Sequence, residues 1–101
     1  MTKIQFKKIK KLILPIAREY HMKYVGIFGS YARGEETKRS DLDLLVSFSR
    51  PVTFFDIIDI ENKIAKRIKI RKVDLVTKGA LHPYIKKHVK KDLKVLYDSR
   101  R

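Results

Sequence analysis

Apolar residues recur along the chain at two different spacings, and the change of spacing predicts where helices and strands lie. Near the N-terminus they follow one face of a helix that reaches Tyr20, with Pro15 inside the stripe. Because proline removes a backbone donor and clashes with the preceding turn, we expect a kink there or a break into two helices. A long helix is expected after Pro51, begun by a capping box of Thr53 and Asp56. Its buried face is predicted to carry Phe54, Ile57, Ile58, Ile64, Ala65 and Ile68.

Shorter apolar runs between the helical stripes predict strands at about residues 23–29, 42–48, 70–76 and 93–97. A last helix, marked by apolar positions from 81 to 89, is expected before the final strand. Gly29 should end the first strand, and Ser30 is expected to cap a short helix over residues 30–34. The elements follow one another without a repeat or a linker. The pattern therefore predicts one α/β domain over residues 1–101.

The composition adds a strong positive charge to this picture. The chain has 25 basic and 11 acidic residues, a formal net charge of +14. This favours either a polyanionic partner, such as RNA, DNA or nucleotide phosphates, or a solvated lysine-rich surface. The absence of cysteine excludes a disulfide framework and a thiolate metal site. No apolar run reaches the ~20 residues that span a bilayer, so a soluble cytoplasmic protein without a membrane partner is expected.

Two aspartates, Asp41 and Asp43, stand two positions apart where the second predicted strand begins. Alternate residues of a strand share a face and each residue rises ~3.3 Å, so these carboxylates should lie about 7 Å apart on one side. Such a pair suits one or two Mg²⁺ ions bound to a triphosphate, because Mg²⁺ prefers hard oxygen ligands. Taken alone, the pair also fits the cap of a turn.

A third acid, Asp74, falls within the most β-prone stretch of the third predicted strand. A charged group there is costly unless it is paired or coordinates a cation. Two interpretations follow. Asp74 either forms an ion pair with Lys72 or Arg71, or serves as a third metal ligand that also orients or deprotonates an incoming hydroxyl group.

The dipeptide Gly29-Ser30, after the first predicted strand, is suited to phosphate. Glycine permits close approach of the backbone, and the amides that start a helix carry partial positive charge. The serine hydroxyl adds a hydrogen bond, although the same dipeptide is common in ordinary turns. Arg33 either holds phosphate or ties the loop to Glu35, Glu36 or an aspartate.

Together these segments resemble the minimal nucleotidyltransferases of the DNA polymerase β-like superfamily. The resemblance rests on Gly29-Ser30-Tyr31-Ala32-Arg33-Gly34, Ser40-Asp41-Leu42-Asp43-Leu44-Leu45-Val46 and Val73-Asp74-Leu75-Val76 in this order and spacing. It covers nearly the whole chain, and the combined motif is far more specific than any of its parts. It implies the nucleotidyltransferase fold, a small mixed β-sheet that contains antiparallel strands and is flanked by helices.

The same resemblance implies a chemistry and a partner. ATP would be the nucleotide donor, with Mg²⁺ in a two-metal site. The catalytic residues and metal ligands would be Asp41, Asp43 and Asp74. The triphosphate would contact Gly29 and Ser30, with Arg33 as a further candidate. Many chains of this size are similar to antitoxins that pair with a HEPN-domain ribonuclease toxin and attach AMP to one of its tyrosines. We therefore expect Mg²⁺-dependent AMPylation of a protein hydroxyl in a toxin–antitoxin system.

Two alternatives stay open. In the first, the chain is a binding antitoxin that inhibits its toxin by covering it, and the acids serve the structure. In the second, it is a nucleotidyltransferase that acts on RNA or a small molecule, in which case RNA binding would weaken steeply as salt rises. A protein acceptor is favoured because the predicted elements use all 101 residues and leave no second domain to grip another acceptor.

Overall fold

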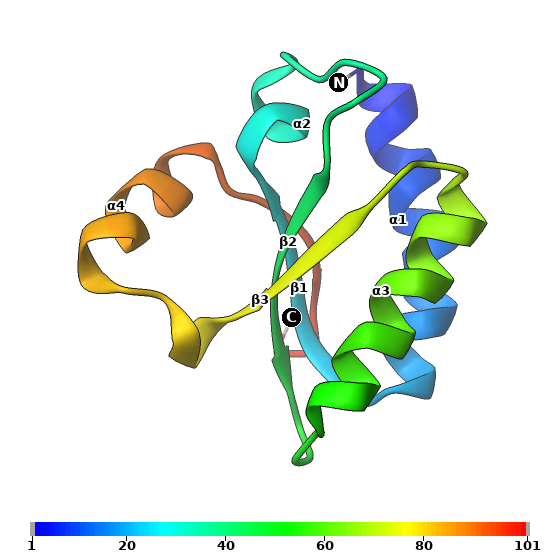
Figure 1. Ribbon diagram of the computed structural model, residues 1–101, viewed down its shortest axis with the longest axis vertical. Helices are drawn as coiled ribbons and strands as arrows, with labels where there is room; N and C mark the ends of the chain where they lie inside the picture. The colour runs from blue at the N-terminus through cyan, green and yellow to red at the C-terminus, as the bar shows by residue number, and fades with distance from the viewer. Residues whose placement is uncertain (1, 101) are drawn as a thin grey trace.

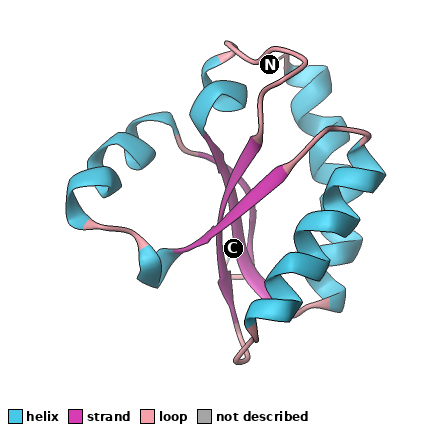
Figure 2. Ribbon diagram, viewed as in Figure 1, coloured by secondary structure: helices cyan, strands magenta, loops and turns pink. Residues whose placement is uncertain are grey.

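A four-stranded sheet with helices on both faces organises the molecule (Figure 1). The computed structural model describes residues 2–100, apart from the side chain of Ile4, so residues 1 and 101, the expected ends of the domain, lie outside the description. Along the chain the elements are α1 (Lys3–Glu19), β1 (Met22–Phe28), α2 (Gly29–Arg33), β2 (Leu42–Phe48), α3 (Phe54–Ile68), β3 (Val73–Thr77), the 3₁₀ helix η1 (Lys78–Ala80), α4 (Pro83–Asp92) and β4 (Lys94–Asp98). Figure 2 shows the same elements by type.

The sheet is mixed, as expected. Its strand order is β3-β2-β1-β4, with β1 antiparallel to both β2 and β4 and with β2 parallel to β3. A parallel pair requires a crossover connection, which α3 provides between β2 and β3. Because β2 and β3 run the same way, the residues that begin these two strands lie at the same end of the sheet.

The two faces of the sheet are covered by different helices. Figure 1 shows α1 and α3 together on one side and α4 on the other, with α2 at the end where β1 stops. The main core lies under α1 and α3, where Ile13, Leu44 and Ile64 are almost wholly buried. A smaller cluster of Tyr24, Leu45 and Val89 lies under α4. Among residues 2–100, no helix is both long and apolar enough to cross a membrane.

A kink or a break into two helices was expected at Pro15, and the break is absent, because α1 continues through Pro15. Pro15 lies on the exposed side of α1, so the carbonyl that loses its helical donor stays open to water. On the other side, Ile13, Ile16 and Ala17 are buried within the core and hold the helix against the sheet on either side of the proline.

The start of α3 confirms one prediction and corrects another. The capping box is present, with the Asp56 amide donating to Thr53 Oγ1 at 3.1 Å and the Thr53 amide donating to Asp56 Oδ2 at 2.8 Å. Phe54, predicted to be buried, is 74% exposed, as is its neighbour Phe55 at 76%. The buried stripe is instead centred on Ile60 and Ile64, while the two rings of the first turn pack edge to face against each other.

Candidate active site

A sharp bend joins β1 to α2, and Gly29 is the residue that allows it. Its φ is +76°, a left-handed conformation that side chains other than glycine rarely adopt. A Cβ placed on Gly29 would collide with Oδ2 of Asp43. The bend therefore requires glycine for two reasons, its backbone conformation and the close approach of a carboxylate.

The predicted boundary at this bend is wrong by one residue. We expected Gly29 to end the strand and Ser30 to cap the helix, but α2 begins at Gly29 with Phe28 in the cap position and no side-chain cap. Ser30 lies inside the first turn and is half-buried, and its hydroxyl makes no hydrogen bond to another described residue. That hydroxyl is consequently available to a ligand.

The three predicted acids lie on one face of the sheet. Asp43 is the register partner of Asp74 in the parallel β2–β3 pair and of Phe28 in the antiparallel β1–β2 pair. Register partners point to the same face, and Asp41 shares that face because it lies two residues before Asp43. The alternate residue Leu42 points the other way and is fully buried in the main core. The acids thus face the α4 side, beside the bend at Gly29.

The crowding of these carboxylates has an electrostatic cost. Burial, followed by the charges of Asp74 and Asp41, raises the pKa of Asp43, while Arg33 and Lys72 oppose the rise. In addition, Oδ1 of Asp41 is buried and accepts no hydrogen bond within the described structure. An unsatisfied buried oxygen costs about 1–3 kcal/mol. A cation or a donor at this point would relieve both penalties.

The third acid does not complete a closed metal centre as the side chains stand. Asp74 Oδ1 lies 3.5 Å from Lys72 Nζ, so the ion pair considered from the sequence is present. No group of three His, Cys, Asp or Glu side chains in residues 2–100 is arranged to hold a metal ion. The donor set nevertheless suits a hard cation, because Asp41 offers an unpartnered oxygen next to the crowded Asp43. The Lys72–Asp74 pair is largely exposed, and such pairs contribute about 0–1 kcal/mol, so Asp74 gives it up at little cost.

Arg33 connects α2 to the loop that follows it and to the end of α4. Its Nη1 donates to Asp92 Oδ2 at 2.7 Å and its Nε donates to Glu35 Oε2 at 3.2 Å. The hydrogen bond to Asp92, and then that to Glu35, raises the pKa of Arg33 further above its usual range. The interpretation that Arg33 ties the loop is therefore confirmed for Glu35, while its role toward phosphate stays a prediction. An aspartate was also among the expected partners, but the sequence did not indicate Asp92, at the end of α4, because it stands 59 positions away.

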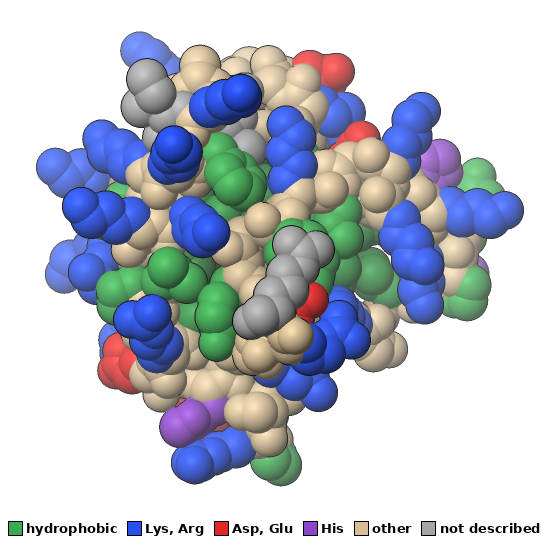
Figure 3. All heavy atoms as spheres, turned by 180° about the vertical axis from the view of Figure 1, so that it is seen from behind, with side chains coloured by type: hydrophobic (Ala, Val, Ile, Leu, Met, Phe, Trp, Pro, Cys, Tyr) green, Lys and Arg blue, Asp and Glu red, His purple; other side chains and the backbone are tan. Residues whose placement is uncertain are grey.

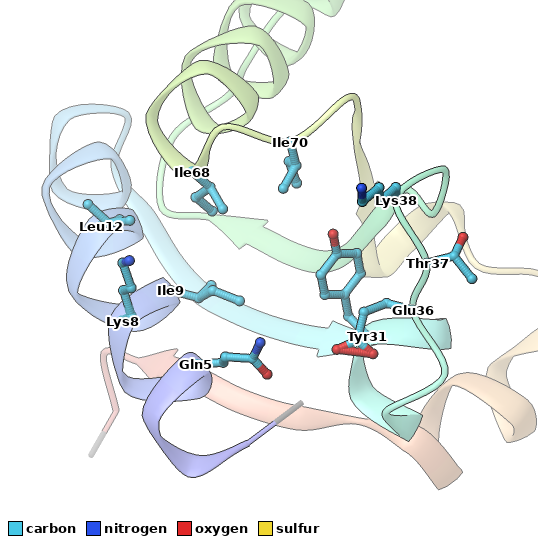
Figure 4. A pocket seen from close by; sticks show the side chains of 10 residues that line it. All are labelled: Gln5, Lys8, Ile9, Leu12, Tyr31, Glu36, Thr37, Lys38, Ile68 and Ile70. Atoms are coloured by element: carbon cyan, nitrogen blue, oxygen red, sulfur yellow. The ribbon is translucent and has the colours of Figure 1, made fainter.

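A pocket of about 390 Å³ lies beside α2 but does not contain the acids (Figure 4). Tyr31 projects into it from α2, toward Ile70 and Lys38, and Ile9 of α1 lies on the opposite wall. Burial, and then the charge of Glu36, raises the pKa of Tyr31. The pocket belongs to the layer of α1 and α3, so Tyr31 packs on the side of the sheet away from the carboxylates.

A mixed sheet in which a glycine-serine bend faces acids on two parallel strands is the arrangement of a nucleotidyltransferase. Residues 7–101 match the protein family described as Polymerase beta, Nucleotidyltransferase. The chain belongs to this family.

Known relatives agree with this assignment. A Methanocaldococcus jannaschii protein described as a candidate protein adenylyltransferase is 42% identical over 77% of this chain and 80% of its own length. The protein adenylyltransferase MntA of Thermococcus cleftensis is 30% identical over 92% of this chain and 97% of its own length. A solved structure of a tri-AMPylated Shewanella oneidensis HEPN toxin in complex with MNT antitoxin has a TM-score of 0.72 at 18% identity, over 94% of this chain and 74% of that chain. At that identity the likeness shows a shared fold.

Proposed function

We propose that this chain is a Mg²⁺-dependent protein adenylyltransferase that acts as an antitoxin. It transfers AMP from ATP to a hydroxyl group of a partner protein, a tyrosine of a HEPN ribonuclease toxin. The observation that carries the proposal is the gathering of Asp41, Asp43 and Asp74 on one face, at a bend where Gly29 leaves room for a close approach. The names of the relatives support the same activity, and the fold shared with a chain of a toxin–antitoxin complex supports the partner.

In the proposed reaction, the acceptor oxygen forms a bond to the α-phosphorus of ATP. The bond from that phosphorus to the α–β bridging oxygen breaks, and pyrophosphate leaves with the electron pair. The proton of the acceptor hydroxyl passes to the carboxylate of Asp74, which lies on the edge strand where an acceptor has access. The free hydroxyl of Ser30 donates to a phosphate oxygen, and Gly29, with its left-handed backbone, forms the bend beside which the triphosphate lies.

The residues that would hold Mg²⁺ are Asp41, Asp43 and Asp74. Asp41 contributes the oxygen that has no partner, and Asp43 contributes a carboxylate whose raised pKa reflects crowding that a cation relieves. When bound, Mg²⁺ supplies positive charge that offsets the triphosphate and favours loss of the acceptor proton. Asp74 must exchange its ion pair with Lys72 for this role.

The direct test is to incubate the purified chain with ATP labelled at the α-phosphate, Mg²⁺ and the proposed partner, a HEPN-domain toxin. We expect label on the partner, a mass increase of one adenylyl group per modified site, and loss of the toxin's ribonuclease activity. Asp41→Asn and Asp43→Asn should reduce transfer by at least ~100-fold, because each removes charge from the reacting centre. Asp59→Asn on the exposed side of α3 is the matched control, with the same change of charge away from the site.

A binding antitoxin without transferase activity is the second candidate function. It is favoured by the ion pair of Asp74 with Lys72, because an acid in such a pair has a structural role without a metal. In that case Asp43→Asn would neutralise the toxin as well as the unchanged chain does, with or without ATP. Equal neutralisation together with no label on the partner would therefore reject the transferase and retain the binding antitoxin.

A further inference from the structure

A groove runs between α4 and the sheet on the same face as the three acids, toward the opposite end of the strands. Two hollows form it, of about 260 Å³ and 360 Å³, and they share Tyr24 and Lys78 in their walls. The first lies under α4, and the second lies where β1 begins and β2 and β4 end. We call the two together the α4 groove. The activity proposed above assigns it no role.

The floor of the α4 groove is aliphatic. Leu45 of β2, Leu81 before α4, Val89 of α4 and Leu93 after it line the hollow under the helix. Among the described residues of its walls the one aromatic side chain is Tyr24, which is only 6% exposed, and Lys78 Nζ lies 3.5 Å from the centre of its ring. The floor therefore suits apolar side chains and offers no open aromatic face on which a base could stack.

The rim of the same groove is basic. Lys78, Lys86 and Lys90 line the hollow under α4, and Lys23 and Arg100 line the other. None of the described residues that line the two hollows is acidic. Figure 3, which views the molecule from the side opposite to Figure 1, shows Lys and Arg side chains spread over the whole of that view, with fewer acidic ones among them. An occupant of the groove would therefore meet positive charge from these five side chains.

These cations also oppose one another. Burial lowers the pKa of Lys78, and the charge of Arg100 lowers it further, with smaller effects in the same direction from Lys23 and Lys86. Asp98 acts in the opposite sense, but it is already hydrogen-bonded to the Arg100 side chain at 3.2 Å. A negative charge placed in the groove would relieve this repulsion.

We propose that the α4 groove binds an acidic segment of the acceptor protein, one that also carries apolar side chains. The inference rests on the proposed function, which requires a protein acceptor. Carboxylates of the segment pair with the lysines of the rim, and its apolar side chains cover the aliphatic floor. Because the groove and the acids share one face of the sheet, a partner held in the groove presents its hydroxyl groups on the face where transfer takes place. An RNA strand would satisfy the rim but not the floor.

The probe for this assignment is a short fluorescein-labelled peptide of repeating Glu-Glu-Leu, measured by fluorescence anisotropy. We expect it to bind the unchanged chain more tightly than an oligoglutamate of equal charge and more tightly than an oligouridine RNA. The double variant Lys86→Glu/Lys90→Glu should weaken binding at least roughly tenfold, because it reverses two charges of the rim. The matched control is Lys10→Glu/Lys11→Glu on the exposed side of α1, which changes the net charge equally and should weaken binding less than roughly threefold.

Two results would overturn the assignment. The first is an equal loss of peptide affinity in both double variants, which would mean general attraction to a basic surface. The second is tighter binding of the RNA than of the peptide, abolished by Lys86→Glu/Lys90→Glu, which would make the groove a nucleic-acid surface. If the charge reversal prevents folding, Lys86→Gln/Lys90→Gln serves in its place, with at least a roughly threefold loss expected from the two missing charges.

The AMP-transfer assay tests the role of the α4 groove separately from the proposed transferase activity. With the acceptor protein, Lys86→Glu/Lys90→Glu should raise the KM for the acceptor and leave the affinity for ATP unchanged, since neither lysine lies at the Gly29 bend. An unchanged KM would reject the groove while the transferase stands. Conversely, peptide binding that follows the predicted order in a chain that transfers no AMP would reject the transferase and leave the groove in place.

Discussion

Replacing Gly29 with alanine adds one methyl group at the point where α2 approaches β2. The residue has a φ of +76°, and the new methyl group would collide with Oδ2 of Asp43. Two penalties therefore apply at once. The backbone must hold alanine in a left-handed conformation, and the carboxylate must move away from the position it occupies beside the bend.

The first penalty has a known size of about 1–2 kcal/mol for a residue with a Cβ. In a domain of this length, each kcal/mol lowers the melting temperature by about 4–8 °C, so the backbone cost alone predicts a fall of roughly 10 °C. The second penalty falls mainly on activity. A displacement of about 1 Å at a reacting centre can reduce the rate about 100-fold, and we expect at least that loss in kcat/KM for AMP transfer.

A matched control is available in the same helix. Gly34 ends α2 with a φ of +73° and is exposed, so Gly34→Ala carries the same backbone penalty at a position away from Asp43. We expect Gly34→Ala to lose a similar amount of stability and to transfer AMP within about threefold of the unchanged chain. Melting temperatures come from circular dichroism, and rates from label transfer below the lower of the two melting temperatures.

The reasoning is refuted if Gly29→Ala transfers AMP as fast as Gly34→Ala at equal folded fraction. In that case the close approach of Asp43 to the bend has no bearing on catalysis. A binding measurement with Mg²⁺ and ATP by calorimetry shows where a confirmed loss arises, because displacement of Asp43 should weaken the binding of both.

The remaining predictions concern stability. Because the pKa of Asp43 is raised in the folded state, the folded protein binds more protons than the unfolded chain, and metal-free protein should lose stability as pH rises from about 3.8 through the raised pKa. Asp43→Asn removes that loss, so its stability relative to the unchanged chain should increase from acidic to neutral pH, measured by urea unfolding at the two pH values; an unchanged difference at the two pH values would contradict this. Ile64→Ala, at a side chain with 0% exposure, should cost about 2–5 kcal/mol, whereas Phe54→Ala should cost less than about 1 kcal/mol, and similar midpoints in guanidinium chloride would contradict the burial argument. Thr53→Ala should cost about 1 kcal/mol through loss of the helix cap, and Thr53→Ser should restore most of it.

Local periodicity predicted the strands and the placement of two of the acids. Asp41 and Asp43 share a face because side chains alternate along a strand, and this rule needs no knowledge of the neighbouring elements. The second strand was predicted with its observed bounds, Leu42–Phe48. The position of Asp74 could not be predicted from alternation along one strand, because only the parallel register of β2 with β3 brings it beside Asp43. The sequence did not predict that register; the resemblance to a family implied only that Asp74 belongs to the same site as Asp41 and Asp43.

The errors arose where contacts between distant residues decide the outcome. The bend lies at Gly29 and not at Ser30, against a carboxylate from β2, and the local sequence contains no sign of that neighbour. Phe54 follows the apolar pattern of α3, yet no described element covers the first turn, so its ring stays exposed. In both cases the pattern identified the element correctly and failed at its end, where there are fewest neighbours to fix a side chain.

Arg33 shows how such a distant contact also bears on function. From the sequence, Arg33 was expected to bind phosphate, a nearby glutamate or an aspartate. In the structure its side chain donates hydrogen bonds to Asp92, at the end of α4, and to Glu35. The ion pair joins α2, which forms the bend, to α4, which walls the groove. Since the positive charge of Arg33 also opposes the raised pKa of Asp43, the helix that would hold the acceptor is connected through one side chain to the carboxylate that would hold the cation. A partner seated against α4 would therefore contact a helix that this ion pair joins to the bend.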